Sequence, residues 1–244
     1  MTTKNSLSWQ YDEFKQVGTD YSYKAELYIY DSRHTDFRHR VSTSINILDS
    51  LEITGSDLVI DFGAGTGNFV IQAARRCARV YSVDVSQAIL DIVQSKTTQA
   101  ELSNVEFHHA GFLNYEHADQ PVDAIVTTFS LHHLPDFWKG IAFKRMNRML
   151  KPFGKLYIQD VIIEEDNALK NIQALIDKLK NSGGNPLRED TERHFQDEYS
   201  TYDWLMDGLL CRAGFSIKSK HIDDGVFGTY ICIKEKKVPK AILP

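Results

Sequence analysis

Short apolar runs alternate with amphipathic stretches along most of the chain. The runs predict buried β-strands because they are short and rich in Val, Ile or aromatic residues. Seven such segments are found: DLVIDFG, RVYSVDVS, VEFHHA, VDAIVTTFS, KPFGKLYIQDVII, FSIKSKHI and GTYICIK. Strands alternating with helices indicate a parallel α/β sheet that is covered on both faces.

The segments between these strands carry helical periodicity. Residues 38–51 place Val41, Ile45, Leu48 and Leu51 on one face. Ser86 is positioned to cap a helix over 87–94, and Thr201 a helix over 201–212. Further helices are expected over 68–77, 137–150 and an apolar stripe at 168–179, which the loop NSGGNP is expected to end.

The composition is that of a soluble globular protein. The 244 residues are expected to form one domain, with a net charge of −5 that argues against a nucleic-acid or anionic-membrane partner. Three cysteines without CxxC spacing indicate neither a disulfide framework nor a zinc site. No leader or membrane-spanning run is recognised, so a cytoplasmic protein is expected.

The stretch LVIDFGAGTGNFV carries the first candidate chemistry. A glycine-rich turn between a strand and a helix lets a ligand approach the backbone closely and aims free N–H groups at it. Gly63, Gly65 and Gly67 form G-x-G-x-G, with Asn68 where the dinucleotide fingerprint G-x-G-x-x-G has its third glycine. The spacing therefore disfavours a pyrophosphate ligand.

Two carboxylates accompany this turn. Asp61 ends the first strand, where it can orient the loop or meet an ammonium group. Asp84 ends the second strand, at the distance from the glycines where a carboxylate accepts hydrogen bonds from ribose hydroxyls. Together they indicate an adenosine-type ligand that needs no phosphate.

With these features in place, DFGAGTGN, VYSVDVS, VDAIVTTFSLHHLPD and LKPFGKLYI resemble the successive motifs of class I S-adenosylmethionine-dependent methyltransferases. The chain is most similar to their small-molecule branch, which includes ubiquinone- and menaquinone-biosynthesis enzymes. The resemblance implies a Rossmann-like, doubly wound, seven-stranded α/β sheet in the order 3-2-1-4-5-7-6, with strand 7 antiparallel. It also implies S-adenosyl-L-methionine as cofactor and a small-molecule methyl acceptor.

Carried over by motif, the resemblance implies that these residues bind the donor: Asp61, Gly63, Ala64, Gly65, Gly67, Asn68, Asp84, Val85, Gly111, Phe112, Thr128 and Phe129. One departure concerns the adenine amino group. Family members often place an acidic residue after strand 3, whereas this chain has Gly111 and Phe112 there. Backbone groups and packing on Phe112 are expected to hold the adenine instead.

Acid–base chemistry is needed only if the acceptor must lose a proton. His133 and His132 follow strand 4, where the acceptor is expected, and are the candidate catalytic bases. An equally strong alternative is that they only fix the loop by hydrogen bonding. Asp160, in strand 5, is a weaker candidate for this base and is interpreted as structural. His108 and His109 point to opposite sides of a strand, and no metal site is assigned.

The domain is divided into five parts. These are an N-terminal helical cover (1–52), a donor-binding core (53–163), a lid insertion (164–200), a closing helix and strands (201–234) and a tail (235–244). The lid is inferred from its place after strand 5, and the cover from aromatic residues such as Trp9 and Tyr11. Simple packing of both segments on the core is the alternative.

Two other functions stay open at this point. One is a nicotinamide-dependent oxidoreductase, which Asn68 disfavours. The other is donor binding without catalysis, or carboxymethyl transfer to RNA, which the acidic balance disfavours. The motif TFSLHHLP lacks the Asn/Asp-Pro-Pro-aromatic pattern of amino-methylating enzymes and the nucleophilic cysteine of cytosine C5 enzymes. The sequence leaves a homodimer open.

Overall fold

A computed structural model describes residues 8–15, 17 and 37–236. Of residues 37–42 only the helical backbone is described. The expected N-terminal cover lies partly outside these ranges. The predicted packing of Val41, most of the N-terminal aromatic residues and nearly all of the tail also lie outside the described residues.

One mixed sheet forms the centre of the molecule, in the order β3-β2-β1-β4-β5-β8-β7. Its strands are β1 (Leu58–Phe62), β2 (Arg79–Asp84), β3 (Val105–His109), β4 (Val122–Thr128), β5 (Leu150–Ile163), β7 (Phe215–Asp223) and β8 (Phe227–Lys234). The first five run parallel, and β8 is antiparallel to both β5 and β7. The predicted order is confirmed. A two-residue strand, β6 (Thr201–Tyr202), adds to the carboxyl end of β5.

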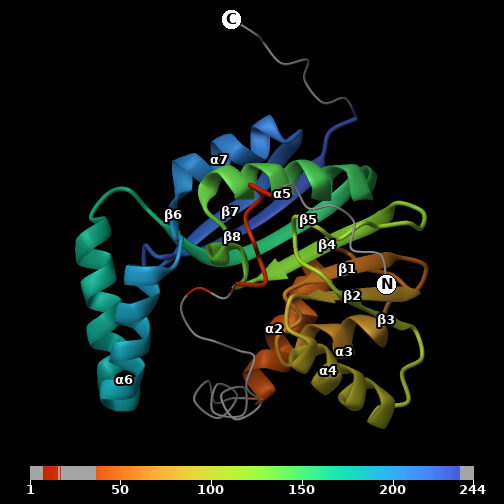
Figure 1. Ribbon diagram of the computed structural model, residues 1–244, viewed down its shortest axis with the longest axis horizontal. Coiled ribbons are helices and arrows are strands. Elements are labelled where there is room, and N and C mark those ends of the chain that lie inside the picture. The colour runs from red at the N-terminus through yellow and green to blue at the C-terminus, as the bar shows by residue number, and fades with distance from the viewer. Residues whose placement is uncertain (1–7, 16, 18–36, 237–244) are drawn as a thin grey trace, which may run out of the picture.

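Helices cover both faces of the sheet (Figure 1). On one face lie α2 (Phe37–Ser50), α3 (Asn68–Ala74) and α4 (Gln87–Gln99). On the other lie α5 (Asp136–Met149) and α7 (Asp203–Arg212). The central strands are therefore buried on both sides, which explains why β1 is almost wholly apolar: all five residues of LVIDF are buried.

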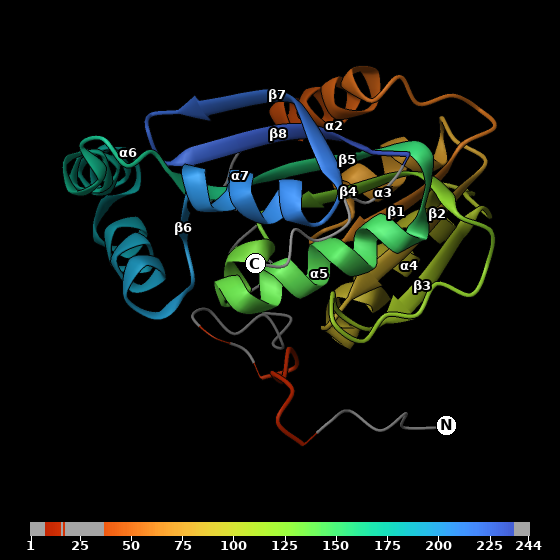
Figure 2. The same cartoon turned by 90° about the horizontal axis from the view of Figure 1, so that it is seen from above.

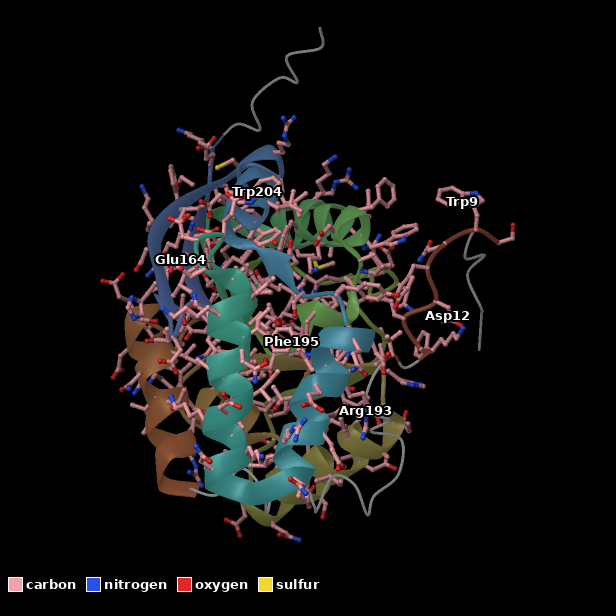
Figure 3. The ribbon with its side chains drawn as sticks, turned by 90° about the vertical axis from the view of Figure 1, so that its left-hand side faces the viewer. Trp9, Asp12, Glu164, Arg193, Phe195 and Trp204 are labelled. Carbon is pink, nitrogen blue, oxygen red and sulfur yellow. The ribbon has the colours of Figure 1, made fainter. Side chains whose placement is uncertain are left out.

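The segment after β5 departs from the expected single helix. Helical structure includes the NSGGNP residues apart from Gly184, so that α6 spans Ala168–Asp197. Gly184 breaks it with a left-handed φ of 75°, and the chain turns back there as a second arm beside the first (Figure 3). Figures 1 and 2 show α6 at one end of the sheet, beyond β6.

A second correction concerns Thr201, which was expected to cap the helix that follows. Thr201 belongs to β6, and α7 begins at Asp203 without a side-chain cap. The backbone pairing of β6 with β5 takes the place of the cap as the anchor of this segment. By contrast, the Ser86 hydroxyl caps α4 as predicted, accepting a hydrogen bond from the Ile89 N–H.

None of the helices within the described residues is long and apolar enough to cross a membrane.

Candidate donor and acceptor site

A cavity of about 710 Å³ opens at the carboxyl ends of β1, β2 and β4. This is the edge at which ligands bind in parallel α/β sheets. Every residue predicted to bind the donor or act as a base lines it, except Gly67 and His132. The lining thus includes Asp61, Gly63, Ala64, Gly65, Asn68, Asp84, Val85, Gly111, Phe112, Thr128, Phe129 and His133.

The three glycines of the turn after β1 serve different purposes. Gly63 has a φ of 78°, and a Cβ there would lie 1.9 Å from the Ser130 Oγ. Gly65 has a φ of 50°, and a Cβ there would meet no atom of the described residues within 4 Å, so its backbone is exposed to the cavity. Gly67 instead starts α3 as its N-cap and packs close to Val93. Close approach and left-handed backbone explain why glycine occupies each position.

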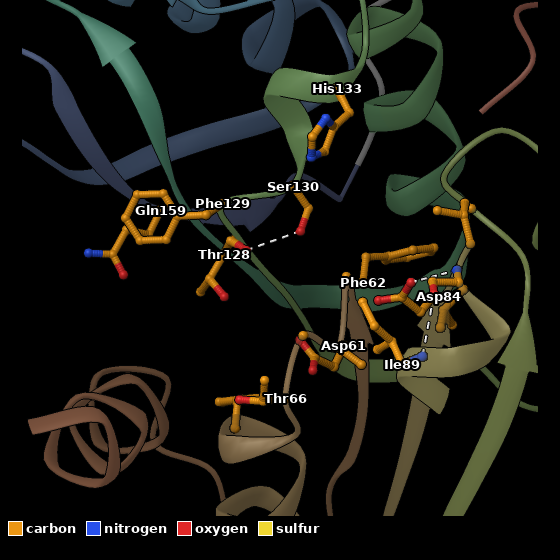
Figure 4. Close-up of a pocket in the computed structure, with 18 of the residues that line it drawn as sticks. Asp61, Phe62, Thr66, Asp84, Ile89, Thr128, Phe129, Ser130, His133 and Gln159 are labelled. Atoms are coloured by element: carbon orange, nitrogen blue, oxygen red, sulfur yellow. Dashed lines mark hydrogen bonds between the residues drawn. The ribbon is translucent and has the colours of Figure 1, made fainter. Parts of the chain in front are cut away.

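Two buried carboxylates face the same cavity (Figure 4). Burial, together with the nearby charge of Asp84, raises the pKa of Asp61 well above its usual range. Burial also raises the pKa of Asp84 to about 6, although its carboxylate accepts a hydrogen bond of 2.8 Å from the Ser86 N–H. A buried negative pair favours a ligand that brings N–H or O–H donors and positive charge.

Glu13 is a lining residue that the sequence did not indicate. Its Oε1 accepts a hydrogen bond of 2.8 Å from the Leu113 N–H, while its Oε2 is buried and has no partner among the described residues. A Cβ on Gly111 would lie 2.5 Å from this Oε2. Burial raises the pKa of Glu13 to about 7. The N-terminal segment thus brings the Glu13 carboxylate next to Gly111 and Phe112, the residues after β3 where family members often have an acidic residue.

The turn after β4 forms the opposite wall. Phe129 adopts a left-handed φ of 50°, and its N–H donates to the Gln159 carbonyl at 2.7 Å. The following residues form the short helix η1 (Leu131–His133). Figure 4 shows the His133 ring projecting from η1 toward the cavity above Ser130. Burial and the charge of His132 lower the pKa of His133 to about 4, which keeps its ring neutral.

The two adjacent histidines are directed differently. The His132 ring lies outside the cavity lining, with Nδ1 2.6 Å from Asp160 Oδ1 and Nε2 3.3 Å from Glu198 Oε2. Burial disfavours its cation, but the charges of Asp160 and Glu198 outweigh this and raise the pKa of His132. His133 is therefore the histidine placed to meet a ligand, while His132 is held between carboxylates.

The α6 hairpin closes one side of the cavity. Leu179 and Ser182, at the end of its first arm, and Leu187, at the start of the second, contribute to the lining. Leu179, the last residue of the apolar stripe identified in the sequence, thus lies at the candidate site. The insertion at 164–200 thus contributes side chains to the wall of the cavity.

Comparison with known proteins agrees with this geometry. The sequence profile of the methyltransferase domain family matches residues 59–154. An uncharacterized methyltransferase of Oceanobacillus iheyensis is 31% identical over 149 residues, which cover 61% of this chain and 66% of that protein.

Solved structures share the fold. A methyltransferase dependent on S-adenosylmethionine from Clostridium acetobutylicum superposes with a TM-score of 0.64 at 14% identity, over 87% of this chain and 99% of that one. The magnesium protoporphyrin IX methyltransferase of Synechocystis was solved with bound S-adenosylmethionine. It superposes with a TM-score of 0.56 at 14% identity, over 82% of this chain and 79% of that one.

The chain belongs to the class I S-adenosylmethionine-dependent methyltransferases. The residues present fit this donor: the turn after β1 leaves backbone exposed at Gly65, and Asp61 and Asp84 offer two buried carboxylates. The unpartnered Glu13 Oε2 is a further acceptor for an N–H group. The cofactor is therefore S-adenosyl-L-methionine, as in the family.

Proposed function

We propose that this enzyme methylates a small-molecule acceptor, which enters beside His133 under the α6 lid. The observation that carries the proposal is the cavity itself. Its volume of about 710 Å³ lies within the range of pockets that hold small organic molecules, and α6 residues close it on one side. A nucleic-acid or protein acceptor would need an open, extended surface next to the donor.

The donor is proposed to lie along the predicted residues. The Gly63–Gly65 backbone and Asp61 hold its amino acid end, Asp84 accepts from its ribose hydroxyls, and Val85 and Phe112 flank its base. Thr128 and Phe129 line the end where methyl transfer takes place. When bound, S-adenosylmethionine supplies an electrophilic methyl group. The chain's own task is to align the acceptor and exclude water.

The charges of the lining argue against the competing functions. Glu13, Asp61 and Asp84 contribute carboxylates, and Lys15 is the one lysine or arginine among the described lining residues. Such a lining repels a pyrophosphate or an RNA backbone. It suits a donor that carries an ammonium and a sulfonium group.

His133 is proposed as the base that accepts a proton from the acceptor. Its ring lines the cavity, and neither ring nitrogen makes a hydrogen bond with any residue in the described ranges. Its position is fixed by the backbone, because the His133 carbonyl accepts a hydrogen bond of 3.0 Å from the Tyr11 hydroxyl. The ring is thus held in place and free to meet a ligand.

A cytoplasmic location is part of the proposal. Cys77, Cys211 and Cys232 are all free thiols, and two of them are buried. Free thiols are typical of a reducing compartment.

The acceptor class can be tested with tritiated S-adenosylmethionine. We expect label to pass to material of low molecular mass when the enzyme is mixed with a metabolite extract, and then to members of a panel of quinones, polyketide-like phenols and amines. Purified RNA and protein from the same cells should stay unlabelled. Label in the macromolecular fraction alone would contradict the proposal.

His133→Gln is expected to lower kcat by about 10²-fold or more, as removal of a general base does, while binding of S-adenosylhomocysteine stays unchanged. The measurement is steady-state turnover of the acceptor found above, with calorimetry for binding. His221→Gln is the matched control, because His221 is exposed and pairs only with Asp223 within the described chain. A His133→Gln enzyme with wild-type kcat would show that His133 only shapes the wall.

A further inference from the structure

A second cluster of ligand-type side chains lies outside the donor cavity lining, against η1. It consists of His132, His194 and Glu198, and one ligand atom from each lies within 4.8 Å of the others. The residues come from separate parts of the chain. His132 belongs to η1, His194 to the second arm of α6, and Glu198 ends that arm as its C-cap.

Each nitrogen of the two imidazole rings lies close to a polar partner. His132 turns Nδ1 to Asp160 at 2.6 Å, and His194 turns Nε2 to the Ser200 hydroxyl at 2.8 Å. The other nitrogens, His132 Nε2 and His194 Nδ1, face Glu198 Oε2 at 3.3 Å and 2.5 Å. Each ring therefore has one nitrogen tied to an outer partner and one directed at the shared carboxylate.

This arrangement is typical of metal sites. Histidines that bind metals usually hold their second nitrogen against a carboxylate, carbonyl or other polar group, which fixes the tautomer and the ring orientation. Asp160 provides that contact for His132, and Ser200 for His194. Two imidazoles and one carboxylate are also a common ligand set for a divalent transition metal.

The buried carboxylates of this cluster also favour a bound cation. Asp160 and Glu198 are both deeply buried, with side-chain exposures of 2% and 6%. The adjacent Lys139 ammonium donates its hydrogen bonds to Asp136 and to the Tyr199 carbonyl. The negative charges of two such carboxylates balance the charge of one divalent cation.

We propose that His132, His194 and Glu198 bind one Zn²⁺ ion, with Asp160 and Ser200 as supporting groups. The ion joins the end of the α6 lid to η1, the element that carries His133. The Tyr199 N–H already donates to the His132 carbonyl at 2.8 Å, so the two segments are in register for such a link. Three protein ligands leave one position of a tetrahedral ion to a solvent molecule.

The test is direct titration of the full chain with Zn²⁺, after removal of metal with a chelator and dialysis. Calorimetry should show one ion per chain, and the thermal unfolding midpoint should rise with Zn²⁺ concentration. Loss of a ligand in His194→Ala, or its neutralisation in Glu198→Gln, should weaken binding by about 100-fold or more. Glu198→Gln keeps the shape of the side chain and guards against simple misfolding.

His221→Ala serves as the control and should bind Zn²⁺ like the wild type, because His221 lies at the surface, with Asp223 as its partner. Co²⁺ should give the intense visible absorption of a four-coordinate ion in the wild type and in His221→Ala, but not in the two ligand variants. Failure of the wild type to bind Zn²⁺, or equal binding by the ligand variants, would overturn the proposal. None of these measurements depends on the methyl donor or on the acceptor.

Discussion

Asp84→Ala is expected to weaken binding of S-adenosylhomocysteine by about 100-fold or more. Asp84 ends β2 with its carboxylate in the cavity, where it can accept two hydrogen bonds from a ribose diol. Hydrogen bonds to a charged group contribute about 1.5–3 kcal/mol each, and every 1.4 kcal/mol changes affinity about tenfold. Titration calorimetry of the wild type and the variant measures the change directly.

The matched control is Asp91→Ala, an exposed carboxylate on the neighbouring helix α4 whose described partner is Gln87. It should bind S-adenosylhomocysteine like the wild type. NADH should bind to neither protein, since the turn after β1 carries the G-x-G-x-G spacing. Wild-type affinity in Asp84→Ala would show that the donor does not lie across the end of β2.

A stability measurement separates lost binding from lost folding in this variant. The pKa of Asp84 is raised from 3.8 to about 6 by burial, so its ionisation disfavours the ligand-free fold as pH rises through this interval. Asp84→Ala has no such group. Relative to wild type, the variant should therefore be more stable at about pH 8 than at about pH 4. Urea denaturation of both proteins at the two pH values measures this difference in the free energy of unfolding.

The donor side of the site could be predicted because it depends on local sequence. Asp61 and Asp84 lie at the carboxyl ends of β1 and β2, and the glycine turn follows β1 directly. Parallel strands bring their carboxyl ends to one edge of the sheet. The strand order followed from the family resemblance. Gly67, which the motif also includes, lies outside the cavity lining and starts α3 as its N-cap.

Other parts of the site depend on the path of the chain and had no local signal. Glu13 reaches the cavity because the N-terminal segment crosses to Leu113, a contact between residues far apart in sequence. The second arm of α6 was missed because a glycine pair ordinarily ends a helix. Here Gly184 supplies the turn, and the chain then resumes the helix and carries His194 back to His132.

The same limit applies to the difference between the two adjacent histidines. From the sequence alone, His132 and His133 are equally good candidates for the catalytic base. In the structure, η1 directs His133 into the cavity and His132 against Asp160. Asp160 was interpreted as structural from its place in strand 5. Its contacts, described next, support that interpretation.

Asp160→Ala is expected to produce the largest loss of stability, about 3–5 kcal/mol, which is typical of removing one partner from a buried ion pair. Asp160 is 1% exposed. Its Oδ2 accepts hydrogen bonds from the Ser130 and Leu131 N–H groups at 3.1 and 2.8 Å, and its Oδ1 from the Val161 N–H at 2.7 Å. Alanine leaves these donors and His132 without their acceptor, and each buried unpaired donor costs about 1–3 kcal/mol.

Urea denaturation in the presence of a chelator, which removes any contribution from bound metal, measures this loss. Asp160→Asn keeps one carbonyl oxygen and should fall between wild type and alanine. Asp123→Ala is the matched control, because Asp123 also accepts a backbone hydrogen bond, from Leu58, and pairs with Lys151, but its side chain is 24% exposed. It should cost about 1 kcal/mol, as partly exposed pairs do.

The consequence of Asp160 for the site follows from what it holds. Through Ser130, Leu131 and His132 it fixes the turn after β4, and this turn positions His133 and Ser130 at the cavity. Asp160→Asn, where it remains folded, should therefore lower acceptor turnover more than it weakens binding of S-adenosylhomocysteine, whose proposed contacts lie mainly at β1 and β2. An Asp160→Ala protein as stable as Asp123→Ala would show that the turn is held by other contacts.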